Sequence, residues 1–331
     1  MKAGEVSRMF SSFKKMRIGV IGDLMLDTYW WGDVERISPE APVPIVAISG
    51  KEQRIGGAGN VALNLMSLGA GVEVLGVIGN DEEGDDLVEL LGKKNIGVKY
   101  LTKSSNRPTS NKIRIISRNQ HMMRLDSETT AFLNADEEKV LIDAFARYIK
   151  EVKPQMIIFE DYNKGVLSEK VITECIALCK KNKVLTAVDP KRKNFFSYKG
   201  VDIFKPNLKE AREGLNILRE EISKGALENM HKELHRKLNN EISLITLSER
   251  GVFVQHKDDS IMIPTHVRNI SDVSGAGDTV IAVAALVYAA TDNVRLMAEV
   301  ANIAGGLVCE EVGTVAIDAN KLMVECELLL S

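Results

Sequence analysis

The stretch Asp272-Val-Ser-Gly-Ala-Gly-Asp-Thr279 leads into a predicted helix that begins at Gly277. A glycine-rich turn directly before a helix exposes backbone N–H groups, and the positive end of the helix dipole adds to their attraction for an anion. The sequence therefore predicts a phosphate-binding turn. In this turn the N–H groups of Gly275, Ala276 and Gly277 are expected to form an anion hole for charge that develops during a reaction.

The carboxylate of Asp278 lies at the mouth of this turn. At that position it is well placed to accept a proton from an attacking hydroxyl group. The alternative is that the glycines only allow tight packing and that Asp278 caps the helix. Because several small residues already open the helix, a cap explains this aspartate poorly. We predict that Asp278 is a general base.

The rest of the chain alternates short apolar runs with helical stretches, which is the pattern of an α/β protein. This alternation predicts a doubly wound, mostly parallel sheet flanked by helices, in which ligands bind at the carboxyl ends of the strands. Asp23 directly follows the first predicted strand and should therefore face a site. The predicted strands are 17–22, 72–78, 156–159, 184–188 and 243–247, and the predicted helices include 61–68, 168–181, 220–238 and 294–310.

Two further segments have extended character and lie outside this alternation. The segment from Asp27 to Gly50 carries three prolines, two tryptophans and several β-branched residues, and Lys112–Ser117 follows Pro108. The two segments could pair with each other. We predict a small β-sheet lid from residues 28–55 and 106–124, within a single domain that spans residues 1–331.

Composition and charge exclude several classes of partner. The formal net charge is -3, with acidic and basic residues interspersed, so no footprint for nucleic acid or an anionic membrane is present. The four cysteines form no C-x-x-C pair and are expected to be free thiols in the core. Without a signal peptide or a long apolar run, the protein is expected to be cytoplasmic.

Three motifs together resemble the ribokinase-like (PfkB) carbohydrate kinase family. They are Asp272–Thr279, the segment Gly56-Gly-Ala-Gly-Asn60 before a helix, and Asn207-Leu-Lys-Glu210. The resemblance implies a ribokinase-like fold, ATP as phosphoryl donor, and magnesium. It also implies that Gly56, Gly57 and Asn60 bind the sugar.

For the nucleotide side, the resemblance implies that Asn207 and Glu210 help to organise magnesium and the phosphates. Glu210 would act through water, because magnesium usually keeps several waters. Asn207 is also a good helix N-cap, and both roles can coexist. Lys191, Asp272, Ser248 and Gly251 are expected beside the nucleotide, although Ser248-Glu-Arg-Gly251 is equally typical of a hairpin turn.

Within this family, the segment from Gly22 to Ile45 is closely similar to the opening of the D-glycero-D-manno-heptose 7-phosphate kinases. Met123–Asp126, Asp161–Gly165 and Asp189–Lys191 also resemble segments of these heptose kinases. The resemblance implies phosphorylation of the anomeric C1 hydroxyl to give heptose 1,7-bisphosphate. This product would feed nucleotide-activated heptose for the bacterial cell surface.

Acidic and basic residues in these segments are candidates for sugar binding. Asp23 and Asp27 are expected to accept hydrogen bonds from sugar hydroxyls, although Asp27 alone could be a solvated turn residue. Arg124, Lys164 and Lys191 are the candidates for binding the phosphate that the sugar already carries. Each of the three could instead be a solvated surface charge.

Several alternatives and expectations concern the whole protein. In bifunctional relatives a nucleotidyltransferase module with an H-x-G-H motif follows the kinase, and none of the five histidines here forms that motif. We therefore expect only the kinase step, without a nucleotidyltransferase domain. A homodimer through the lid is expected, with a monomer as the alternative. A same-fold kinase for another sugar phosphate or a nucleoside, and a non-catalytic sugar-phosphate sensor, are the rival functions.

Overall fold

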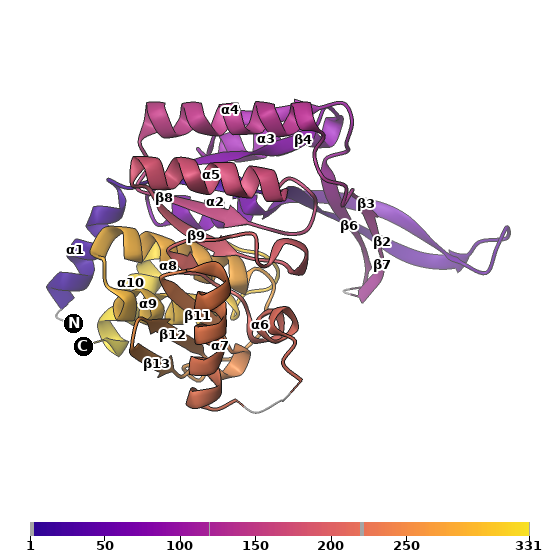
Figure 1. Cartoon of the computed structure of the whole chain (residues 1–331). Coiled ribbons are helices and arrows are strands. Elements are labelled where there is room, and N and C mark those ends of the chain that lie inside the picture. Colours follow the sequence, from indigo (N-terminus) through magenta and orange to yellow (C-terminus); the bar gives the residue numbers. More distant parts are fainter. Residues whose placement is uncertain (1–2, 119, 219–221, 331) are drawn as a thin grey trace.

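The computed structural model describes residues 3–118, 120–218 and 222–330 of the 331-residue chain. Its centre is a nine-stranded sheet (Figure 1). The strands from β11 to β5 run parallel, while β12 and β13 continue the sheet in antiparallel fashion. In spatial order the strands are β13 (Asp259–Ile263), β12 (Val252–His256), β11 (Ile242–Thr246), β10 (Ile203–Phe204), β9 (Leu185–Asp189), β8 (Met156–Glu160), β1 (Arg17–Gly22), β4 (Gly71–Gly79) and β5 (Gly97–Ser104).

Two hydrophobic cores cover the two faces of this sheet. Strand residues alternate between them, so that Val20 of β1 joins one core and Ile21 the other. One core includes side chains of α1 (Ala3–Phe13), α2 (Ala58–Ser67), α3 (Glu82–Lys93), α8 (Ala276–Thr291), α9 (Val294–Val308) and α10 (Ala319–Leu329). The other includes α4 (Ala135–Val152), α5 (Glu169–Asn182), α6 (Leu208–Leu215) and α7 (Lys224–Leu238). The predicted doubly wound, mostly parallel sheet is confirmed.

A second sheet of four strands projects from the body (Figure 1). Its order is β3 (Pro44–Gly57), β2 (Leu24–Ile37), β6 (Ser110–Ser117) and β7 (Gln120–Ser127). β2 pairs with β6 in parallel, and the other two pairs are antiparallel. The expected pairing of the two extended segments is therefore confirmed, and the strands extend a few residues beyond the predicted limits.

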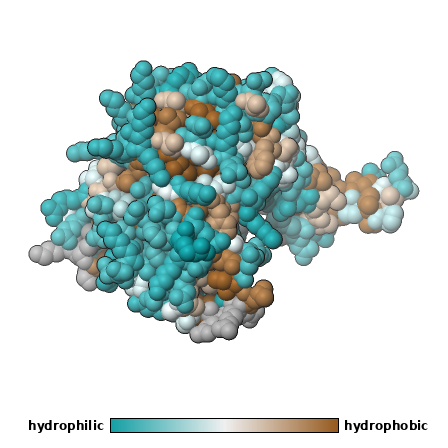
Figure 2. All heavy atoms as spheres, in the orientation of Figure 1, coloured by the Kyte–Doolittle hydropathy of each residue, from teal (hydrophilic) through white to brown (hydrophobic). Residues whose placement is uncertain are grey.

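The surface of this second sheet carries several exposed apolar side chains, which appear as brown spheres along the projecting arm in Figure 2. They include Ile37, Val43, Ile48, Met123 and Leu125. All four cysteines are free and buried, as predicted. Within the described ranges, no helix combines the length and apolarity that crossing a bilayer requires.

Candidate active site

The site lies at the carboxyl ends of three neighbouring strands. Gly22 at the end of β1 is in register with Glu160 at the end of β8, which is in register with Asp189 at the end of β9. Parallel strands present these ends at one edge of the sheet, so the acidic residues that follow them converge. The first turn of α8 faces the same edge, because a Cβ atom at Gly277 would lie 3.7 Å from Asp189 Oδ2.

Asp278 is held in this first turn of α8 by two donors. Its Oδ2 accepts a hydrogen bond from Asn60 Nδ2 (2.7 Å), and its Oδ1 accepts one from the Tyr162 hydroxyl (2.6 Å). Gly275, and not Asp278, occupies the N-cap position. Burial raises the pKa of Asp278 to about 6, although the bonds from Tyr162 and Asn60 oppose the rise. A carboxylate with such a pKa can accept a proton near neutral pH.

The glycine turn before α8 leaves two backbone N–H groups without an acceptor among the described residues. Gly275 has φ 78°, a left-handed conformation that favours glycine. In the described part of the chain, no side chain caps this helix start, and Gly275 and Gly277 have no acceptor for their N–H groups. The Ala276 N–H donates to the Val273 carbonyl (3.3 Å). In this conformation, Gly275 and Gly277 therefore offer the available N–H groups.

A network of carboxyls and lysines lies beside Asp278. One oxygen each of Glu160, Asp189 and Asp278 lie within 4.8 Å of one another. Asp189 pairs through its two oxygens with Lys191 (3.0 Å) and Lys205 (2.8 Å). Burial would raise the pKa of Asp189, but the two lysines outweigh it and hold that pKa below its usual value.

Glu160 differs from its neighbours because neither of its carboxyl oxygens has a hydrogen-bond partner among the described residues. Its side chain is fully buried. Burial, together with the charges of Asp189 and Asp278, raises the pKa of Glu160 well above its usual value. A neutral Glu160 is the state that these surroundings favour.

Asp23 is fully enclosed by the loop that follows β8. Its Oδ2 accepts backbone N–H bonds from Tyr162 (2.8 Å) and Lys164 (3.0 Å), and its Oδ1 accepts one from Val166 (3.1 Å). Burial raises the pKa of Asp23, against these three bonds. Asp23 therefore orders the loop in addition to any contact with a sugar.

The neighbouring Asp27 lies on β2, where its Oδ1 forms an ion pair with Arg114 (2.6 Å). Two glycines allow the close packing around these carboxylates. A Cβ atom at Gly56 would lie 2.4 Å from Asp27 Oδ2, and one at Gly57 would lie 2.4 Å from the Asp23 carbonyl oxygen. Gly57 also has φ 58°. These contacts explain why this stretch needs glycine.

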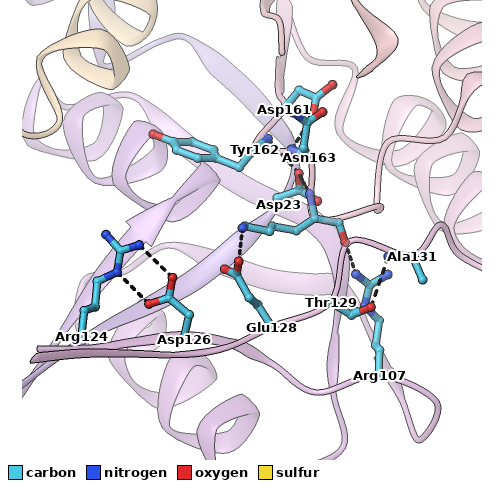
Figure 3. Close-up of polar contacts among 11 residues, drawn as sticks. Asp23, Arg107, Arg124, Asp126, Glu128, Thr129, Ala131, Asp161, Tyr162 and Asn163 are labelled. Carbon is cyan, nitrogen blue, oxygen red and sulfur yellow. Dashed lines mark hydrogen bonds and ion pairs between the residues drawn. The ribbon is translucent and has the colours of Figure 1, made fainter. Parts of the chain in front are cut away.

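The three basic residues predicted to bind a sugar phosphate are all paired with carboxylates. Lys164 bonds to Glu128, and Arg124 on exposed β7 bonds to Asp126 through two nitrogens (Figure 3). Lys191 lies between Asp189 and Glu210, at 2.9 Å from Glu210 Oε1. Lys191 is thus on the side of the site where Glu210 lies.

Arg107 is a cation that no sequence motif indicated. Its Nη2 donates to the Lys164 carbonyl oxygen, and it forms no ion pair within the described ranges (Figure 3). Burial lowers the pKa of Arg107, while the charges of Asp23 and Glu137 oppose this. A partly buried guanidinium with unused N–H donors is well suited to bind phosphate.

The expected nucleotide residues separate into two groups. Asn207 and Glu210 form a reciprocal capping box at the start of α6, with both bonds at 2.8 Å. Asp272 joins its own turn to a neighbouring loop, because it accepts hydrogen bonds from Ser274 and from the Gly313 N–H (3.0 Å). The capping box therefore orders the backbone beside Lys191, and the contacts of Asp272 order the backbone of the glycine turn.

Ser248 and Gly251 form the second group, in the hairpin connection between β11 and β12. Gly251 has φ 91°, and a Cβ atom there would lie 2.0 Å from the Ile263 carbonyl oxygen. Local packing therefore accounts for this glycine. In the described part of the chain, no hydrogen bond joins Ser248 or Gly251 to Asp278 or its neighbours.

Four residues around the site were not predicted from the sequence: Tyr162, Glu160, Lys205 and Arg107. Tyr162 lies inside the segment Asp161–Gly165, of which only Lys164 was selected. Glu160, two residues before Tyr162, ends an apolar strand, where a carboxyl beside an aspartate could have been recognised as a site residue. The contacts of Lys205 and Arg107 depend on distant segments and leave no local pattern.

Comparison with known proteins identifies the family to which this chain is similar. Residues 15–321 match the model of the pfkB family carbohydrate kinases. The bifunctional protein HldE of Aliarcobacter butzleri (strain RM4018) is 42% identical over 302 residues, which cover 91% of this chain and 62% of that protein. This chain therefore spans about three fifths of the length of that relative.

Solved structures show the same fold at lower identity. Phosphofructokinase-2 from Escherichia coli in complex with potassium matches with a TM-score of 0.77 and 18% identity, over 94% of this chain and 99% of that chain. Arabidopsis thaliana ribokinase complexed with ribose and ATP matches with a TM-score of 0.71 and 16% identity, over 93% of this chain and 98% of that chain. Since the family model covers nearly all of the sequence, the chain belongs to the pfkB family of carbohydrate kinases.

Proposed function

We propose that this carbohydrate kinase phosphorylates the anomeric C1 hydroxyl of D-glycero-D-manno-heptose 7-phosphate with ATP to give heptose 1,7-bisphosphate. The observation that carries the kinase step is Asp278, buried beside a glycine turn with available N–H groups. The substrate rests on the resemblance of residues 22–45 to heptose 7-phosphate kinases and on the 42% identity to a bifunctional protein HldE.

In this proposal Asp278 accepts the proton of the C1 hydroxyl as the oxygen attacks the γ-phosphate of ATP. Its pKa of about 6 supports the role, because the ionised form dominates at neutral pH and a base is most effective when its pKa is near the working pH. The N–H groups of Gly275 and Gly277 stabilise the charge on the transferred group. Asn60 holds the carboxylate through its side-chain N–H group.

For the phosphate that the sugar already carries, the geometry favours Arg107 over the three cations chosen from the sequence. Lys164, Lys191 and Arg124 form ion pairs with carboxylates, whereas Arg107 forms none among the described residues. Arg107 also lies near Asp23, at the sugar end of the site. We therefore assign the phosphate contact to Arg107.

Family members use ATP with a divalent metal, and the carboxylate oxygens of this site are the ligand type that magnesium takes. Glu210 is held by Asn207 and Lys191, with 15% of its side chain exposed. This position suits a contact with magnesium through water. When bound, magnesium would neutralise charge on the phosphates.

A lid-to-lid homodimer is part of the proposal. Met123 and Leu125 of β7 are in register with Ile115 and Ile113 of β6, so these four side chains share one apolar face of the projecting sheet. We expect the wild type to be a dimer and Met123→Lys to be a monomer by light scattering after size-exclusion chromatography. Val140→Lys, on an exposed position of α4, is the control. A monomeric wild type would refute this part.

Substrate choice is tested by sugar-dependent ADP release from magnesium ATP. The panel contains D-glycero-D-manno-heptose 7-phosphate, fructose 6-phosphate, ribose and adenosine. Turnover confined to the heptose phosphate supports the proposal. Activity with another acceptor would refute the substrate but keep the kinase, and ligand binding without any turnover would favour a non-catalytic sensor.

A further inference from the structure

The side chain and backbone of Tyr162 connect three parts of the site. Its hydroxyl donates to Asp278 Oδ1 (2.6 Å), and its backbone N–H donates to Asp23 Oδ2 (2.8 Å). Its ring lies 5.4 Å from the Nζ atom of Lys191, which pairs with Glu210. Figure 3 shows the ring extending away from Asp161 and Asn163, the neighbours on either side. Tyr162 therefore contacts the sugar end, the proposed base and the magnesium side.

We infer that Tyr162 is a positioning residue for the phosphoryl transfer: its hydroxyl fixes Asp278 Oδ1 in the orientation that meets the acceptor hydroxyl of the sugar. The inference rests on the proposed function, in which Asp278 is the base. Tyr162 itself needs no contact with the substrate for this role. Nothing in the sequence motifs used above assigns a role to this tyrosine.

The direction of the hydrogen bonds supports this role. An asparagine Nδ2 is a donor only, and the Tyr162 hydroxyl donates its single proton to Asp278 Oδ1. Since both groups face Asp278, its two oxygens accept from Tyr162 and Asn60. A carboxyl that accepts at both oxygens is held as an ionised carboxylate, which is the form a base requires.

Other groups around Asp278 also influence its pKa. The buried carboxyls Glu160 and Asp189 lie within 4.8 Å of it, and the charge of Asp189 disfavours the ionised form of Asp278. The charge of Lys205 favours the ionised form. Tyr162 and Asn60 are the groups that hydrogen-bond to Asp278 directly. Loss of the Tyr162 hydroxyl should therefore raise the pKa of Asp278 and loosen its orientation.

The chain offers a matched control in Tyr198. Its hydroxyl also donates to a buried carboxylate, Asp161 Oδ2, at 2.8 Å. Asp161 neighbours Tyr162 but does not bond to Asp278. Tyr198→Phe therefore removes the same chemical group from the same region without touching the proposed base.

The test compares Tyr162→Phe with Tyr198→Phe in the full chain, after thermal unfolding has shown that both variants fold. In Tyr162→Phe, we expect the midpoint of the acid limb in the pH profile of kcat/KM to move to higher pH by about one unit. At pH values below this midpoint, kcat/KM should then be roughly tenfold lower than in the wild type. Activity should largely return at alkaline pH, and KM for ATP should not change. An unmoved limb in Tyr162→Phe, or an equal shift in Tyr198→Phe, would overturn the inference.

A second readout separates this inference from the proposed function. The carboxyl carbon of Asp278 is followed by carbon-13 NMR in protein labelled at aspartate, with Asp278→Asn to assign the signal. An upward shift of its titration midpoint in Tyr162→Phe alone supports the inference even if no sugar is phosphorylated. An unchanged midpoint, in an enzyme that is otherwise active, refutes the inference and leaves the proposed function intact.

Discussion

Asn60 of α2 donates its side-chain N–H to Asp278 of α8 across 2.7 Å, although the two residues are 218 positions apart in the sequence. The two helices pack against each other in one core, which brings the residues together. The amide expected to contact the sugar is thus bonded directly to the proposed base. A change at either residue should alter the behaviour of the other.

Asn60→Ala should lower activity more than stability, and Asn64→Ala should do the opposite. Asn64, one turn later on α2, accepts hydrogen bonds from the Ile317 N–H (3.0 Å) and the Thr279 hydroxyl (3.1 Å). Its loss leaves the buried Ile317 N–H unpaired, at a cost of roughly 1–3 kcal/mol in the free energy of unfolding, whereas the Thr279 hydroxyl keeps the Gly275 carbonyl oxygen as an acceptor. Urea unfolding and steady-state kinetics of both variants check this, and equal effects on stability would contradict it.

Asp278→Asn should remove about two to four orders of magnitude from kcat, because a neutral amide cannot take the proton of the acceptor hydroxyl. ATP binding should persist, because the glycine N–H groups and Glu210 are unchanged. The measurements are coupled ADP release and ATP affinity by calorimetry. Near-normal turnover in a folded Asp278→Asn variant would show that Asp278 is not the general base.

Activity should fall as the pH drops through about 6. The pKa of Asp278 is raised to about 6 by burial, so below that pH the carboxyl becomes protonated and loses its capacity as a base. The limb should appear in kcat/KM, which reports the free enzyme. The check is a pH series from 5 to 9 at constant ionic strength, and a limb near the usual aspartate pKa of about 4 would contradict it.

Arg107→Ala should raise KM for the sugar phosphate by about one to two orders of magnitude, because charge-assisted hydrogen bonds contribute about 1.5–3 kcal/mol each. KM for ATP should stay near the wild-type value. Arg124→Ala is the control, since Arg124 is exposed and paired with Asp126. A larger rise in KM for the sugar phosphate in Arg124→Ala than in Arg107→Ala would indicate that Arg124 binds the phosphate.

Gly22→Ala should destabilise the fold by about 1–3 kcal/mol or more, because the new methyl group would lie 2.0 Å from the Glu160 carbonyl oxygen. This neighbour is backbone and cannot move away alone. Gly92→Ala on α3 is the control, because a methyl group there meets nothing within 4 Å. Thermal unfolding of both variants measures the difference, and a stable Gly22→Ala would show that β1 and β8 can separate locally.

The sequence predicted the parts of this protein that carry a local pattern. Apolar runs located the central strands, and the glycine turn with Asp278 located the edge where the site lies. The prolines and β-branched residues also identified the projecting sheet. These features are encoded within a few consecutive residues, so they can be recognised without knowing the contacts between distant segments.

The remainder depends on contacts between segments that are far apart. Helices α1, α3, α4 and α10 were missed, although α4 begins with a full capping box at Asn134 and Glu137. The pairing of Lys191 with Glu210, and the lack of an ion pair at Arg107 among the residues that the structure describes, follow from tertiary placement. The local sequence around a lysine or arginine does not show whether the side chain forms an ion pair with a carboxylate in the folded protein.

The position of β1 has a consequence for synthesis of the protein on the ribosome. β1 lies between β4 and β8, and its partner β8 begins only at Met156. At about 5–20 residues per second, a translating ribosome needs on the order of ten seconds between these two strands. During that interval one edge of an apolar strand has no partner, so the nascent chain exposes an edge that can pair with other chains until Met156–Glu160 has been synthesised.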